Sequence, residues 1–194
     1  MGAIGWIVIG IIVLLVIIFI AMVAGGYNGL VRFRNEVKNA WAQIDVQLKR
    51  RHDLIPNLVE TVKGYKNFER ETLEAVTKAR NVAVQASSTG AGAAAIGKAE
   101  GELSGALARL MVVVERYPDL KANQNFLALQ EELTSTENKI SFSRQYYNDS
   151  VLKYNNQTQV FPSNIIAGMF NFKGSEFFQV TAEAEREAPK VSFS

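Results

Sequence analysis

The sequence contains no cysteine and only one histidine, His52, among its 194 residues. The lack of cysteine excludes disulfide bonds and thiolate metal sites, although it fits a protein on either side of a membrane. One histidine leaves almost no room for a His-based metal cluster or a Ser-His-Asp triad within one chain. The sequence also lacks the Glu-x-x-His motif of carboxylate-bridged metal sites and any glycine-rich loop after a strand. We therefore expect no cofactor and no metal, and we interpret the protein as not being an enzyme.

Charge is absent from one long stretch, Ile4 to Ala24, which also contains no proline. As a helix it is about 31 Å long, enough to cross a hydrocarbon core of about 30 Å. A buried core helix normally has a polar face, and this stretch has none. The pattern predicts a transmembrane anchor over residues 1–26. A cleaved signal peptide is the alternative, because Ala24, Gly25 and Gly26 are small enough for a cleavage site.

The charges that flank this stretch predict its orientation. Arg32, Arg34 and Lys38 follow it with only Glu36 among them, and no side-chain charge precedes it. By the positive-inside rule the amino terminus lies outside the cell membrane and the rest of the chain in the cytoplasm. The net charge of +2 is too small to indicate a nucleic-acid partner, so the expected surface partner is the lipid bilayer.

After the apolar stretch, apolar positions follow one another at steps of three and four, which is typical of a long helix in a coiled-coil-like bundle. The helix should end near Tyr65 to Asn67, and Pro56 should kink it because proline donates no backbone hydrogen bond. The positions on this seam are Val37, Trp41, Ile44, Leu48, Arg51, Ile55, Leu58, Val62 and Tyr65.

Two shorter helices are predicted next, over residues 68–86 and about 96–117. The segment 87–97 between them, SSTGAGAAAIG, is typical of a flexible turn. The second of these helices carries Gly97, Gly101 and Gly105 at steps of four. Glycine in a helix interior costs about 0.5–1 kcal/mol relative to alanine, so this close-packing stripe should allow an approaching backbone. The neighbour is either another helix of the bundle or a second copy of the chain.

A long fourth helix is predicted to begin between Pro118 and Asn125 and to end near Asn155. Four helices without a convincing strand indicate an all-α fold, an elongated antiparallel up-down bundle over residues 27–156. Its first and fourth helices are long and its second and third are short. The short pair covers only half of the long pair, so the tail, other copies or a partner must cover the remaining apolar seam.

The tail, residues 157–194, is rich in phenylalanine and is broken by Pro162 and Gly168. Three places are open for it: along the exposed seam, on a neighbouring protomer, or in the membrane interface. Its aromatic residues are Phe161, Phe170, Phe172, Phe177, Phe178 and Phe193.

Arg51 is the one charge on the apolar seam of the first helix. Antiparallel pairing of the two long helices places it opposite residues 133–140, where Glu137 lies. A buried charge without a partner costs several kcal/mol, so we predict an ion pair between Arg51 and Glu137 that fixes the helix register. His52 could instead accept a phosphoryl group, but no basic residue on the next turn would shield the phosphate. We therefore interpret His52 as a structural histidine.

An ordered set of residues resembles the LemA family of bacterial membrane proteins. The run RR-x-DLIPNLV over residues 50–59 is specific, and the resemblance extends from the apolar stretch to about residue 190. The resemblance implies a single-pass inner-membrane protein with a helical bundle, and it implies no enzymatic activity or cofactor. The other matching residues are Tyr27-Asn28, Leu30-Val31, Ala40-Trp41, Ile44 to Leu48, Val62 to Tyr65, Tyr117 to Asn123, Phe126 to Leu133, Glu137-Asn138, Arg144, Tyr147-Asn148, Tyr154-Asn155 and Phe161-Pro162.

Two functions fit these features. The first is a membrane-anchored scaffold that forms homo-oligomers through its bundle and organises membrane or partners. The second is an adaptor or regulator of a membrane protease or signalling complex, which predicts binding to another membrane protein. The two differ in whether purified protein is a large multimer or a small species that binds a heterologous partner in fixed ratio.

Overall fold

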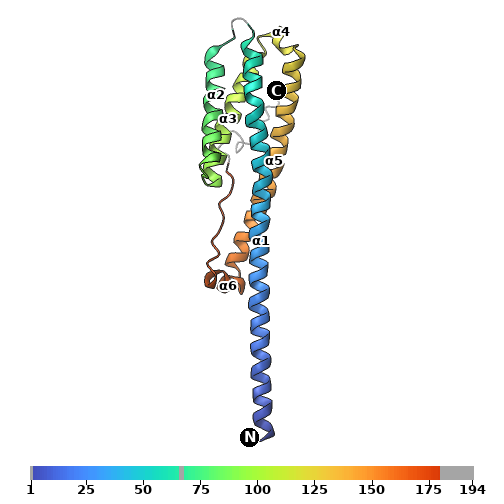
Figure 1. The fold of residues 1–194 in the computed structure, drawn as a ribbon, viewed down its shortest axis with the longest axis vertical. Helices are drawn as coiled ribbons and strands as arrows, with labels where there is room; N and C mark the ends of the chain where they lie inside the picture. Colours follow the sequence, from blue (N-terminus) through green and yellow to red (C-terminus); the bar gives the residue numbers. More distant parts are fainter. Residues whose placement is uncertain (1, 66–67, 180–194) are drawn as a thin grey trace, which may run out of the picture. The chain divides into compact units, whose positions relative to one another are not determined.

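The computed structural model describes residues 2–65 and 68–179, and none of these residues lies in a strand (Figure 1). The predictions of an all-helical fold and of a long apolar amino-terminal helix are confirmed, although six helices are present where four were predicted. The helices are α1 (Ala3–Lys63), α2 (Arg70–Ser88), α3 (Ala93–Val114), α4 (Pro118–Lys121), α5 (Gln124–Gln159) and α6 (Ser163–Met169).

The turn between α2 and α3 is much shorter than the predicted segment 87–97, so that prediction is wrong. α2 continues to Ser88, and Gly90 reverses the chain with a φ of +67°, a conformation that suits glycine. α3 already begins at Ala93. Alanine is the strongest helix former, so the run of alanines from Ala93 overrides the glycine and serine content of its surroundings.

The predicted fourth helix divides into α4 and α5. Pro118 occupies the first turn of α4, where its missing N–H costs nothing. Asn123 then caps α5, because its side-chain oxygen accepts hydrogen bonds from the backbone N–H groups of Asn125 (2.9 Å) and Phe126 (3.1 Å). α5 continues to Gln159, past the predicted end near Asn155.

The chain forms two compact units. One consists of residues 42–147 and 176–179 of the described chain. This unit contains a four-helix bundle around one apolar core. The bundle is formed by all of α2 and α3, together with the carboxyl-terminal part of α1 and the first part of α5. The core residues are Ile55, Leu58, Val59, Val62, Leu73, Val76, Ala83, Ala99, Leu103, Leu110, Val114, Leu120, Phe126 and Leu133.

The other unit consists of residues 1–41 and 148–175. Its part of α1 includes the apolar stretch, and α1 is long and apolar enough to cross a membrane by length and composition. The large apolar side chains from Ile4 to Met22 are exposed. A small core forms after this stretch, where Leu30 packs against Ile166 and Ala167 of α6. The predicted boundaries at 26/27 and 156/157 stay predictions.

Two hydrogen-bonded side chains hold the segment that follows α6 within this unit. The Tyr154 hydroxyl donates to the carbonyl of Lys173 at 2.8 Å. The Asn155 side chain donates to the carbonyl of Ser175 and accepts from its backbone N–H, at 2.9 and 2.8 Å. The residues after α6 are therefore tied to α5 by backbone contacts that do not depend on their own side chains.

Candidate functional sites: a buried ion network and a surface groove

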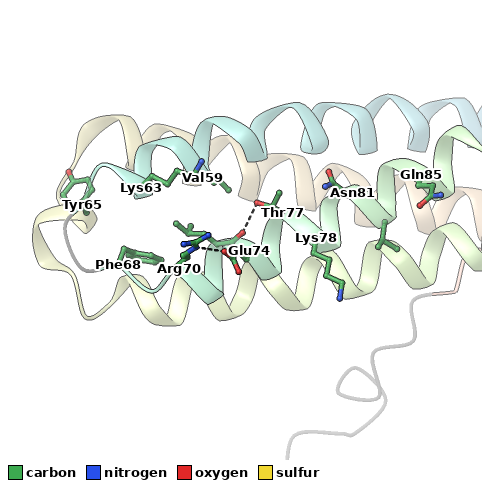
Figure 2. A pocket seen from close by; sticks show the side chains of 12 residues that line it. Val59, Lys63, Tyr65, Phe68, Arg70, Glu74, Thr77, Lys78, Asn81 and Gln85 are labelled. Carbon is green, nitrogen blue, oxygen red and sulfur yellow. Dashed lines mark hydrogen bonds and ion pairs between the residues drawn. The ribbon is translucent and has the colours of Figure 1, made fainter.

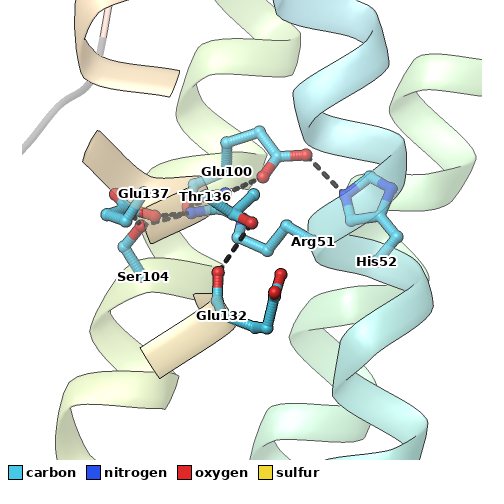
Figure 3. A network of polar contacts seen from close by, with 7 residues as sticks. All are labelled: Arg51, His52, Glu100, Ser104, Glu132, Thr136 and Glu137. Atoms are coloured by element: carbon cyan, nitrogen blue, oxygen red, sulfur yellow. Dashed lines mark hydrogen bonds and ion pairs between the residues drawn. The ribbon is translucent and has the colours of Figure 1, made fainter. Parts of the chain in front are cut away.

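Arg51 of α1 lies in the bundle with only 1% of its surface exposed. Its Nη1 donates to the Glu137 carboxylate of α5 and to the Ser104 hydroxyl of α3, the latter at 3.0 Å. Its Nη2 donates to the carboxylate of Glu100, also on α3 (Figure 3). Arg51 therefore joins three helices through charge-assisted hydrogen bonds, which are stronger than neutral ones.

Glu100 is the second buried charge of this network and is 3% exposed. One oxygen of its carboxylate accepts from Arg51, and the other contacts Nε2 of His52 at 2.7 Å. Glu137, by contrast, has about half of its side chain exposed to solvent. Glu100 is therefore the partner that compensates the buried guanidinium charge, since solvent weakens the contribution of Glu137.

His52 is neutral in this environment. Burial lowers its pKa, and the nearby Arg51 and Arg80 cations lower it further, to about 4, against the opposing charge of Asp53. The negative charge of the Glu100 carboxylate that His52 contacts is already balanced by the positive charge of Arg51. A neutral imidazole with the proton on Nε2 donates the bond to Glu100 without carrying charge.

The structure brings together Arg51 and Glu137, the two residues of the predicted register pair. Sequence reasoning missed Glu100, the most buried acid of the network. A signal for it was present: Glu100 lies three residues before the buried Leu103 and four after the buried Ile96, on the same helical face. That the network fixes helix register stays a prediction.

Pro56 lies inside α1, and the helix continues through it. Because proline has no N–H, the carbonyl of His52, four residues earlier, lacks its usual helical partner. Arg80 of α2 replaces that partner, since its Nε donates to the His52 carbonyl at 2.7 Å. The break in the hydrogen bonding of α1 thus becomes a bond between α1 and α2. The predicted kink at Pro56 stays a prediction.

Replacing Arg80 with methionine is expected to lower the free energy of unfolding by about 1–3 kcal/mol, because the carbonyl of His52 then has no donor. The same replacement should cost clearly less in a Pro56→Ala background, where the alanine N–H bonds to that carbonyl. Urea unfolding of the four variants at neutral pH measures the coupling. Equal costs in both backgrounds would show that Arg80 does not compensate for the proline.

The predicted glycine stripe has different surroundings at its two ends. A Cβ at Gly97 would collide with the backbone carbonyl oxygen of Gln179, so the chain approaches α3 closely there. Gly101 is half-buried. Gly105 is exposed, with nothing within 4 Å of where its Cβ would be. Contacts within the described residues therefore explain why a glycine is needed at position 97, but they do not explain the glycine at position 105. Packing of the stripe between two copies of the chain stays a prediction.

The aromatic residues of the tail fall into separate groups. In the unit of α6, the rings of Phe170 and Phe172 meet Tyr27 edge to face at 4.8 and 5.6 Å. Phe161 of the same unit is exposed. In the bundle unit, Phe178 is buried and Phe177 is half-buried. Phe193 lies outside the described residues.

A groove between α1 and α2 has a volume of about 950 Å³ (Figure 2). Tyr65 and Phe68 lie at one end of it and Gln85 at the other (Figure 2), and Val82 is among the residues that line it. Ion pairs between neighbouring side chains line its edge, as with Arg70 and Glu74 at 2.6 Å. Apolar, polar and charged side chains all line the groove.

The polar side chains of the buried network bind one another, because Arg51 engages the carboxylates of both Glu100 and Glu137. Among the residues that the structure describes, no group of three His, Asp or Glu side chains is arranged to hold a metal ion. The network therefore joins α1, α3 and α5.

Comparisons with known proteins find relatives over most of the chain. The model of the LemA family matches residues 40–193. A protein named LemA from Metamycoplasma hominis is 31% identical over 173 residues, which cover 87% of this chain and 75% of the relative. Magnetosome protein MamQ 2 of Paramagnetospirillum magneticum is 28% identical over 189 residues, covering 86% of this chain and 70% of the relative. Magnetosome protein MamQ of Magnetospirillum gryphiswaldense is 25% identical over 189 residues, which cover 86% of this chain and 69% of the relative.

Proposed function

Since the chain belongs to the LemA family, we propose that it is a non-enzymatic, membrane-anchored scaffold. Its bundles self-associate and thereby organise the membrane or bound partners. The apolar part of α1 supports the membrane anchor. The absence of an enzymatic role is supported by the way Arg51 engages the carboxylates of Glu100 and Glu137. None of the relatives named above is named after a reaction, and two are named as proteins of a cellular structure, the magnetosome.

One observation carries the self-association. Phe142 of α5 is 74% exposed, and two shallow depressions of the bundle surface meet at its ring. Val46 of α1 lines one and Leu127 of α5 the other, and both are also exposed. We name Val46 and Phe142, which line the same depression, the Phe142 strip. Exposed large apolar side chains that lie together typically mark a protein interface, and a second copy is the partner that every purified sample provides.

Replacing Phe142 with glutamate is expected to convert a multimer into a species of lower mass, because a carboxylate cannot be buried in an apolar interface without a partner. Val112→Glu is the matched control, since Val112 lies on α3 of the same bundle and is 71% exposed. Size exclusion with light scattering in mild detergent gives both masses. If both variants keep the mass of the wild type, the strip is not the interface.

The groove of Figure 2 favours a second candidate, an adaptor or regulator of a membrane protease or signalling complex. In this case a partner segment occupies the groove between α1 and α2. Val82→Arg should block it and abolish binding of a partner in fixed ratio, while Val112→Arg should leave that binding intact. Retention of the complex by Val82→Arg would exclude the groove as the binding site.

We further propose that the amino terminus faces outward and that the bundle lies in the cytoplasm of a bacterial cell. Arg32, Arg34 and Lys38 support this orientation. Because the chain has no cysteine, one cysteine introduced at Val112 reports the orientation. A membrane-impermeant maleimide should label it only after the inner membrane is permeabilised, and labelling of intact spheroplasts would reverse the assignment.

A further inference from the structure

We propose that α6 is a second membrane contact, a short interfacial helix whose outer face inserts into the bilayer beside the membrane-spanning part of α1. α6 and the residues that flank it expose apolar side chains on one side. We name this surface the α6 face. It consists of Phe161, Ile165, Met169 and Phe170, all of which are exposed.

The opposite side of α6 fixes its position on α1. Ile166 and Ala167 are buried against Leu30. The end of the Ile166 side chain also lies against Gly26, where a Cβ would collide with it. α6 is therefore held at residues 26–30, immediately after the apolar stretch ends.

Contacts nearer the amino terminus place the α6 face at the edge of the hydrocarbon. Met169 and Phe170 line a depression of about 370 Å³ together with Phe19, Ile20 and Val23. Phe19 lies five residues before Ala24, which is about 8 Å along a helix. Interfacial helices bury their apolar face about 5–10 Å into the boundary between headgroups and acyl chains, so Met169 and Phe170 lie at the required depth.

Polar and cationic groups of the same unit lie where headgroups would be. The Arg34 guanidinium lies 5.0 Å from the centre of the Phe172 ring, and Tyr27 packs against Phe170 and Phe172. The segment 160–175 contains no acidic residue, and it includes Lys173. Aromatic rings and cations at this level are typical of the membrane interface and favour anionic lipids.

Lipid, and not a second copy of the chain, is the occupant that this geometry favours. The α6 face is continuous with the exposed side chains of Phe19 and Ile20, and a membrane-spanning helix is already surrounded by acyl chains at that level. Leaving the α6 face in water would cost about 25 cal/mol for each Å² of apolar surface. The bilayer covers it without any further partner.

Spin labels on single cysteines test this inference, because the natural chain has no cysteine. The full chain carrying Met169→Cys or Ile165→Cys is reconstituted into nanodiscs of phosphatidylcholine with a smaller share of phosphatidylglycerol. Phe19→Cys is the reference within the membrane and Val112→Cys the reference in water. Collisions of each label with oxygen, which partitions into lipid, and with a water-soluble nickel chelate are then measured.

We expect labels at 169 and 165 to collide several-fold less with the nickel chelate than the label at 112, and to resemble the label at 19 in their response to oxygen. Nickel accessibility equal to that at 112 for both labels would overturn the proposal. So would dipolar broadening that disappears on dilution with unlabelled protein, because a second copy would then cover the α6 face. Two label positions guard against one of them perturbing α6.

Discussion

Replacing Glu100 with leucine is expected to lower the free energy of unfolding of the bundle by about 3–5 kcal/mol. Leucine has a similar volume, so the change removes the charge without opening a large cavity. Arg51 would remain buried, with Glu137 as its only carboxylate partner, and solvent weakens that interaction. His52 would also lose the acceptor of its Nε2 hydrogen bond. Urea unfolding followed by circular dichroism in mild detergent measures the loss.

Two further variants separate this explanation from a general intolerance of substitution. Glu132 pairs with Arg50 at 2.5 Å, but about half of each side chain is exposed, so Glu132→Leu should cost less than about 1 kcal/mol. The double variant Arg51→Met with Glu100→Leu should recover most of the stability, because it removes both buried charges. A double variant as unstable as Glu100→Leu alone would contradict the assignment of the cost to an uncompensated arginine.

Acidification from pH 6.5 to pH 4 is expected to remove about 3 kcal/mol of stability through His52 alone. The folded-state pKa of about 4 lies below the ordinary value of 6.5. Between these values the unfolded chain binds a proton at His52 and the folded bundle does not, so protonation favours unfolding. The stabilisation is complete above pH 6.5 and is lost progressively as the pH falls toward 4.

The His52→Gln variant isolates this contribution, since glutamine still donates a hydrogen bond to Glu100 and does not titrate. Free energies of unfolding are measured in steps from pH 7 down to pH 5, above the range in which most carboxylates titrate. The wild type should lose stability faster than the variant over this interval. Parallel curves would show that His52 has the same pKa in the folded and unfolded chain.

Much of the helical bundle follows from the spacing of apolar residues. The seam on the first helix predicted a long helix, and its residues from Ile44 to Val62 are buried as the pattern requires. The ends of the helices were less predictable, because neighbouring residues that favour a helix compete there with residues that favour a turn. The alanines from Ala93 extend α3 into a segment that glycine and serine mark as a turn, and a side-chain cap from Asn123 divides the fourth helix.

The site was predictable only in part. Arg51 was evident because it interrupts an apolar seam, and antiparallel geometry indicated Glu137. Glu100 was overlooked because Lys98 and Glu102 beside it make the segment look solvated, although its helical face is apolar. α6 was hidden by Pro162 and Gly168, which bracket a segment too short for its period to be recognised. Its position depends on contacts with Gly26 and Leu30, which lie far away in the sequence.

The mass of the wild-type protein in mild detergent or lipid nanodiscs tests the central proposal of a self-associating scaffold most directly. Mass photometry over a dilution series distinguishes a stable assembly from several copies that share one micelle or nanodisc by chance. We predict a defined multiple of 21.5 kDa that persists on dilution. Particles that each contain a single copy of the chain would contradict a scaffold and would leave the groove between α1 and α2 as the surface through which the protein acts.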